Sequence, residues 1–245
     1  MTESPRKTSP SDGAPVASPE LPVAFSDPVY LAAVVDLLGA IAYGEMSAFE
    51  RLSEDAKMAP GLPDKVELAR MASREFAHFE GLRLRLGELG ADPFEAMAPF
   101  VAPFDSFHLR TASADWLEGL VKAYVGDGLA ADFYREIATF LDADTRAIIV
   151  ESLADAGQSR FVVDRVRAAI AADPRVGGRL ALWGRRLMGE ALSQAQRVAA
   201  ERDALSALLA GGVDRPGMDL AAIGRLLTRL TENHSQRMES LGLAA

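Results

Sequence analysis

The chain has 245 residues, of which 49% are hydrophobic, and it carries a formal net charge of −9 at pH 7. This is enough apolar sequence for a sizeable core, while the acidic balance argues against extended binding to a phosphate backbone, which depends on Lys and Arg. The sequence contains no cysteine. Disulfides, thiolate zinc sites and cysteine nucleophiles are therefore excluded, and any bound metal must take oxygen and imidazole ligands, as iron and manganese do.

The first 26 residues are rich in Ser, Pro and Ala and are expected to form a disordered N-terminal tail. They lack the apolar stretch of a secretion signal, and no later run of about 18 apolar residues is found that would span a bilayer. We therefore expect a soluble, cytoplasmic protein with no membrane contact. Ser26, Asp27 and Pro28 then supply the N-cap and the first-turn proline that begin a helix.

The remainder of the chain is expected to be helical, because no segment combines alternating apolar and polar residues with β-branched enrichment. Proline and glycine separate six expected helices, at about residues 28–57, 63–89, 114–141, 144–172, 175–210 and 219–241. Short turns pair the first four into antiparallel hairpins, and residues 91–113 form a long crossover between the second and third helices. This all-α order is the connectivity of a ferritin-like four-helix bundle. We place the bundle at residues 27–173, with residues 174–245 as a C-terminal helical extension packed on it.

The first two helices each carry acidic residues inside an otherwise apolar stripe. Glu45 interrupts the stripe of the first helix, and Glu75 and His78 fall on that of the second, with the spacing Glu-x-x-His. Burying an ionised carboxylate is costly unless it is paired, hydrogen-bonded or bound to a metal. A Glu from one helix and Glu-x-x-His from the next form half of the ligand set of a di-metal carboxylate bundle. We interpret the three residues as candidate metal ligands, with a hydrogen-bonded core pair as the alternative.

The next two helices repeat this order with weaker ligands. Asp127 interrupts the stripe of the third helix, and Asp155 opens the motif Asp-x-x-Gln, which ends at Gln158. The shorter carboxylates reach less far, and an amide is a poorer ligand than an imidazole. The fourth helix has two competing apolar stripes, so the sequence leaves open whether Asp155 faces inward, and pairing of both acids with nearby arginines is the alternative. If metal binds, we expect this half to hold it more weakly.

Four motifs, taken in this order, resemble the ferritin-like superfamily: Gly44-Glu45, Glu75-Phe76-Ala77-His78, Tyr124-Val125-Gly126-Asp127, and Phe140-Leu141-Asp142 followed by Asp155-Ala156-Gly157-Gln158. Over residues 28–172 they are most similar to the tRNA 2-methylthio-N6-isopentenyladenosine hydroxylase (MiaE-like) branch. This resemblance implies a non-haem di-iron oxidoreductase, a hydroxylase or monooxygenase that activates dioxygen and acts on tRNA. Glu45, Glu75 and His78 match the ligand pattern residue by residue. Asp127 and Asp155 are conservative departures and Gln158 replaces a histidine, so the second half-site is degenerate.

Three functions from different classes are left open by the sequence. The first is an iron-dependent, or manganese-dependent, hydroxylase of the tRNA-modifying type; the second is a ferritin-like metal-binding protein with little catalysis. The third is a metal-free helical bundle that serves as an interaction module, with the last two helices as the surface of a homodimer. No catalytic residue is assigned outside the ligand set. The segment 160–202 contains nine arginines against four acids, and we interpret it as a solvated helix face rather than a surface for an anionic partner.

The remaining histidines and tryptophans are not expected to be ligands. His108 is interpreted as a loop histidine of the crossover. His234 is expected at a capping or surface position, because Thr231 rather than an acid stands three residues before it. Trp116 and Trp183 are expected to pack on helix faces.

Overall fold

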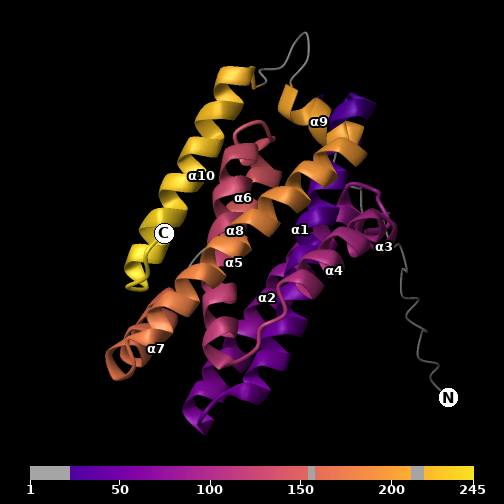
Figure 1. Ribbon diagram of the computed structural model, residues 1–245. Helices are drawn as coiled ribbons and strands as arrows, with labels where there is room; N and C mark the ends of the chain where they lie inside the picture. The colour runs from indigo at the N-terminus through magenta and orange to yellow at the C-terminus, as the bar shows by residue number, and fades with distance from the viewer. Residues whose placement is uncertain (1–22, 154–157, 211–217) are drawn as a thin grey trace, which may run out of the picture.

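The computed structural model describes residues 23–153, 158–210 and 218–245, and no strand is found among them. Its helices are α1 (Pro28–Asp55), α2 (Leu62–Glu88), α3 (Pro93–Met97), α4 (Val101–Arg110), α5 (Trp116–Ala138), α6 (Ala143–Ser152), α7 (Gln158–Ala172), α8 (Arg175–Glu201), α9 (Asp203–Ala210) and α10 (Leu220–Ser240). Short 3-10 turns occur at Val23–Ser26, Ala56–Met58 and Ala98–Phe100. The all-α class expected from the sequence is confirmed (Figure 1).

The described chain begins with a structured turn inside the segment expected to be a tail. Val23–Ser26 forms a 3-10 turn, and Phe25 is buried there against Tyr30, with ring centroids 5.5 Å apart. Asp27 caps α1 as expected, because its Oδ1 accepts a hydrogen bond from the Val29 amide at 2.9 Å. The rest of the expected tail, residues 1–22, lies outside the described residues.

α1 and α2 form an antiparallel hairpin. The apolar stripe of α2 is buried as its spacing predicts, with Leu68, Met71, Phe79 and Leu82 each at most 4% exposed. α1 with the turn after it, Pro28–Met58, contains an 18-residue window of mean hydropathy 1.5, so it is long and apolar enough to cross a bilayer. The sequence expectation concerned unbroken apolar runs, and this window meets a test of length and mean composition alone. In the fold, 56% of that window is buried, which is the burial of a core helix.

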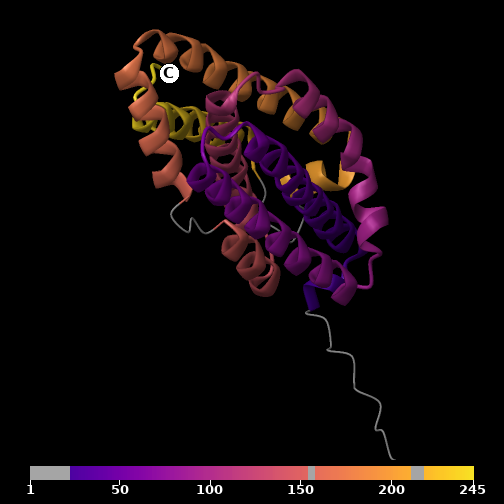
Figure 2. The same ribbon diagram turned by 90° about the horizontal axis from the view of Figure 1, so that it is seen from below.

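Three of the expected helical boundaries differ from the observed ones. The crossover at residues 91–113 contains α3 and α4, and α4 lies beside α1 and meets α8 (Figure 2). The expected helix at 144–172 is divided into α6 and α7, with residues 154–157 outside the described residues. The expected helix at 175–210 is broken at Arg202, whose guanidinium turns to Asp36 of α1 with Nε 3.0 Å from Oδ2.

The core consists of two clusters, and the C-terminal helices contribute to both. One cluster joins α2 and α5 to α8 and α10 and includes Leu68, Val121, Val125, Leu180, Leu187 and Met238. The other joins α1, α2, α5 and α6 to α9 and includes Leu38, Ile41, Leu82, Ile137, Ile149 and Leu208. Residues after 174 are therefore part of the same hydrophobic core as the hairpins, and they complete the wall around the interior of the bundle.

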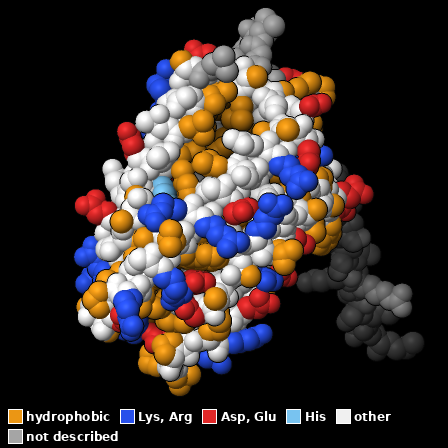
Figure 3. Space-filling model, in the orientation of Figure 1, with side chains coloured by type: hydrophobic (Ala, Val, Ile, Leu, Met, Phe, Trp, Pro, Cys, Tyr) orange, Lys and Arg blue, Asp and Glu red, His pale blue; other side chains and the backbone are white. Residues whose placement is uncertain are grey.

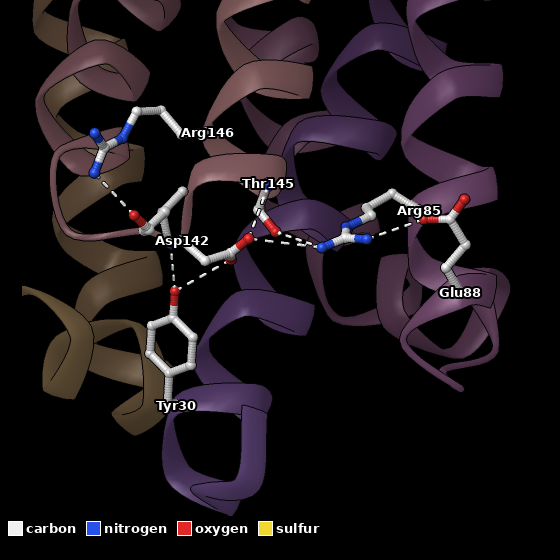
Figure 4. A network of polar contacts seen from close by, with 7 residues as sticks. Tyr30, Arg85, Glu88, Asp142, Thr145 and Arg146 are labelled. Atoms are coloured by element: carbon white, nitrogen blue, oxygen red, sulfur yellow. Dashed lines mark hydrogen bonds and ion pairs between the residues drawn. The ribbon is translucent and has the colours of Figure 1, made fainter. Parts of the chain in front are cut away.

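A polar network fastens one end of this assembly (Figure 4). Asp142 caps α6 by accepting from the Thr145 amide at 3.0 Å, and its own amide donates to the Tyr30 hydroxyl at 2.8 Å. Arg85 of α2, only 7% exposed, donates to the Thr145 hydroxyl at 3.3 Å and lies 3.6 Å from the Asp142 carboxylate. The network links α1 and α2 to the turn between α5 and α6.

Candidate metal centre

Glu45 of α1 and Glu75 and His78 of α2 meet inside the bundle. Glu45 lies 15 residues before Pro60 and Glu75 lies 15 residues after it, so the antiparallel hairpin brings the two residues to the same level. His78 Nδ1 is 3.6 Å from Glu45 Oε2 and 3.7 Å from Glu75 Oε2. One donor atom from each side chain lies within 4.8 Å of the other two. We refer to these three residues as the triad.

The separations in the triad fit a shared cation better than hydrogen bonds. A hydrogen bond between nitrogen and oxygen spans about 2.7–3.2 Å, and His78 Nδ1 is buried with no hydrogen-bond partner. Two ligands of one ion, each at about 2.0–2.6 Å from it, can stand about 4–5 Å apart. Two carboxylates and one imidazole are also the donor types that iron and manganese accept. The donor set therefore fits a single divalent metal ion.

The electrostatics of the triad also call for positive charge. Burial raises the pKa of Glu75 to about 7, and the neighbouring Glu45 carboxylate adds to the rise. The carboxylates of Glu45 and Glu75 raise the pKa of His78 to about 10. At neutral pH His78 is therefore protonated between the two carboxylates, and Glu75 is close to the midpoint of its titration. A metal ion would replace those protons, since ligands bind metals in their deprotonated forms.

The triad opens on a cavity of about 540 Å³. Most of its wall is apolar and comes from every described helix except α3, with Ile41, Phe104, Leu129, Leu192, Leu205 and Leu230 among the lining residues. Figure 3 shows hydrophobic side chains gathered in a hollow on the face where α9 and α10 lie. Tyr134 also lines the cavity, and burial followed by the nearby Glu45 carboxylate raises the pKa of its phenol, which keeps it protonated.

Of the second predicted half-site, the structure describes the side chain of Asp127 alone. Asp127 is exposed, lines the same cavity as the triad and lies outside the cluster of three. Asp155 falls in residues 154–157, outside the described residues, and Gln158 begins α7 with its side chain likewise undescribed. Among the described His, Asp and Glu residues, the triad is the only cluster of three with metal-ligand spacing.

Asp127 lies on the cavity side of α5, although its side chain is exposed. A neighbouring row on the same helix, Val121, Val125 and Leu129, is buried, and Asp132 continues that row. Asp132 accepts a hydrogen bond from Arg237 of α10 at 2.7 Å. α5 therefore carries these two acids on neighbouring rows, and the position of α10 gives Asp132 an arginine partner.

Two histidines lie in other positions than the sequence led us to expect. His108 lies on α4 and lines the cavity, its Nδ1 is buried without a partner, and burial lowers its pKa to about 3. His234 is 5% exposed on α10, with neither ring nitrogen hydrogen-bonded. The sequence does contain a signal for the burial of His234, because Leu226, Leu230 and Met238 lie on the same helical face at spacings of four. Trp183 packs as expected and donates to the Glu118 carbonyl at 3.0 Å.

The arginine-rich segment makes its contacts within the chain. All nine arginines between residues 160 and 202 contact an acidic side chain or a backbone carbonyl. Arg165 pairs with Asp64 at 2.6 Å, and Arg179 pairs with Asp115 at 2.7 Å. These two ion pairs attach α7 to α2 and α8 to the start of α5. The positive charge of the segment is thus largely compensated within the chain.

Comparison with known proteins agrees with this geometry. A model of the ferritin-like domain of actinomycetes matches residues 28–212, a range that includes the triad and every helix from α1 to α9. No curated protein matches the chain. The match extends past residue 173 into α8 and α9, in agreement with their place in the core. Because it covers well over half of the 245 residues, the chain belongs to the ferritin-like domain family of actinomycetes.

Proposed function

We propose that this protein binds one divalent metal ion, iron or manganese, through Glu45, Glu75 and His78. The observation that carries the proposal is the convergence of three donor atoms, from two helices, within 4.8 Å of one another. Its support is the buried His78 Nδ1, which has no hydrogen-bond partner although two carboxylates lie beside it. A lopsided site follows, in which the triad holds the ion and Asp127, Asp155 and Gln158 contribute little.

We further propose that the metal serves an oxidoreductase of the hydroxylase or monooxygenase class. When bound by carboxylates and imidazole, iron supplies dioxygen activation. The chain itself provides the surroundings that such chemistry needs. The cavity wall is mostly apolar, the triad faces it, and the Tyr134 phenol, which keeps its proton, lies near Glu45. The apolar cavity favours this proposal over metal binding alone, because a storage site does not need an apolar cavity of this size.

Metal analysis of protein purified without chelators tests the first proposal. We expect about one iron or manganese ion per chain after production with either metal, and loss of that ion in His78→Ala. Gln158→Ala is the matched control and should retain the metal. Circular dichroism should show that both variants are helical. A wild-type protein that takes up neither Fe(II) nor Mn(II) at micromolar concentrations would overturn the proposal, and two equally tight sites per chain would overturn its lopsided form.

A further inference from the structure

We propose that the cavity beside the triad binds a small, uncharged molecule with a large hydrocarbon portion, such as a terpene or a long-chain alcohol. For its chemistry this inference rests on the proposed function, because it names the class of substrate that the metal centre would meet. Binding itself depends only on the shape and polarity of the cavity.

The size of the cavity is that of a small-molecule site. Its volume of about 540 Å³ falls within the roughly 300–1,000 Å³ of typical ligand pockets. Protein interiors are otherwise close-packed, and side chains that line an empty apolar void lose dispersion contacts with the atoms that would fill it. A ligand with a hydrocarbon body would restore those contacts. The cavity is too large to be a packing defect of one residue, since its wall is drawn from helices throughout the chain.

The charges in the wall favour an uncharged ligand over an anionic one. Arg237 Nη1 donates to Asp132 at 2.7 Å, while its Nε and Nη2 are buried and have no hydrogen-bond partner among the described residues. Arg135 lies 3.5 Å from the same carboxylate. His108 is neutral at physiological pH, because burial lowers its pKa to about 3. Both guanidinium groups thus face the Asp132 carboxylate, and a carboxylate head group in the cavity would also approach the two acidic residues of the triad.

The surface around the cavity favours a free small molecule over RNA. Binding of a phosphate backbone requires Lys and Arg that neutralise phosphates, and the chain has a net charge of −9. The arginines of α7 and α8 already contact acids or carbonyls of the chain, as with Arg165 and Asp64 or Arg186 and the Arg110 carbonyl. The observations thus support recognition of the ligand by the apolar interior rather than by a basic face.

Displacement of the neutral fluorescent probe N-phenyl-1-naphthylamine from metal-free, full-length protein tests the inference. We expect saturable binding of the probe and its displacement by 1-dodecanol, with dodecanoate at least tenfold weaker. Ala191→Phe and Ala195→Phe, both of which line the cavity from α8, should weaken probe binding at least tenfold. Ala195 is exposed and tolerates a larger side chain, so it keeps the test valid if Ala191→Phe does not fold.

Ala200→Phe on the same helix is the matched control, because Ala200 is exposed and does not line the cavity. This variant should bind the probe like the wild type. Equal binding by all three variants would overturn the inference, as would displacement by bulk tRNA but not by 1-dodecanol, which would favour RNA instead. Use of metal-free protein separates the two proposals: probe binding without any metal uptake would contradict the metal site alone, and metal uptake without probe binding would contradict the cavity ligand alone.

Discussion

The two halves of the bundle provide different partners for their inward acids. In the α1/α2 hairpin, Glu45 and Glu75 have His78 as their ion-pair partner among the described residues, at 3.6 and 3.7 Å. On α5, Asp132 and Glu136 pair with arginines of α10. Asp132 and Glu136 are thus held in structural ion pairs, as Asp36 of α1 is with Arg202, whereas Glu45 and Glu75 of the triad are left to share a proton or a cation.

This difference shows that the C-terminal helices decide the role of each acid. Arg237 and Arg229 reach α5 from α10, at 2.7 Å from Asp132 and 2.6 Å from Glu136, and Arg179 reaches Asp115 from α8 at 2.7 Å. No described arginine lies within ion-pair distance of the triad. A carboxylate with a guanidinium partner needs no metal, so the segment after residue 174 neutralises Asp132, Glu136 and Asp36 and leaves the triad available.

Removal of Asp132 should produce the largest effect on stability. Asp132→Ala would leave the Arg237 guanidinium, whose side chain is 14% exposed, without its main partner. Breaking a buried pair in this way costs about 3–5 kcal/mol. Gln236→Ala, at an exposed position beside Arg237 on α10, should change the free energy of unfolding by less than about 0.5 kcal/mol. Urea unfolding of the two variants measures the difference, and equal stabilities would contradict a structural role for the pair of Asp132 and Arg237.

Metal binding to the triad should change the stability of the folded protein by a smaller amount. A ligand that binds only the folded state adds about 2.7 kcal/mol at a hundredfold excess over its Kd. Fe(II), kept anaerobic, or Mn(II) should raise the melting temperature of the wild type, and Glu75→Gln should reduce that shift. Asp127→Asn serves as the control and should respond like the wild type. A melting temperature unaffected by either metal would place the triad with the purely structural acids.

Close packing of the first hairpin should be sensitive to one added methyl group. Gly39 of α1 lies so near α3 that a Cβ there would collide with the Ala96 carbonyl. Gly39→Ala should therefore cost about 1–3 kcal/mol through overpacking. Gly81→Ala on α2, where nothing lies within 4 Å of the new Cβ, should instead stabilise by about 0.5–1 kcal/mol, since alanine is the better helix former. Thermal unfolding that shows the same sign for both variants would contradict this packing.

Lowering the pH should have the smallest effect on the stability of the fold, through His108 of α4. The pKa of His108 is about 3 in the folded state, because of burial, against 6.5 as the ordinary value. A depressed histidine pKa gives stability that is present above pH 6.5 and is lost as pH falls toward 3. Between pH 6.5 and 5.5 the loss should be at most about 1 kcal/mol, reduced by the partial exposure of the side chain. His108→Gln should flatten this part of the pH profile in urea unfolding; an unchanged slope would show that His108 titrates normally.

The sequence predicted the first hairpin well and the second poorly, for a physical reason. α2 has one apolar stripe, and Leu68, Met71, Glu75 and Phe79 on it are all buried. On α5 two apolar rows lie side by side, and the arginine partner of Asp132 comes from α10, which follows about 90 residues later in the sequence. The break at Arg202 has the same origin, because Asp36, its partner, is distant in the chain. The local spacing of apolar residues predicts the buried face of a helix only where the helix has a single apolar stripe. Where it has two, contacts with residues distant in the sequence decide which side chains are paired or buried.

The place of the cavity wall in the chain has a consequence for how the protein folds during synthesis. α2 ends at residue 88 and α10 begins at residue 220, so 131 residues separate the hairpin that holds the triad from the helix that helps to close the cavity. At about 5–20 residues per second, the ribosome needs roughly 7–26 seconds to make that stretch. During this time the apolar side chains that will line the cavity, and the acids of the triad, face solvent. The proposed metal ion and hydrophobic ligand would therefore reach their sites most easily before the last helices are made.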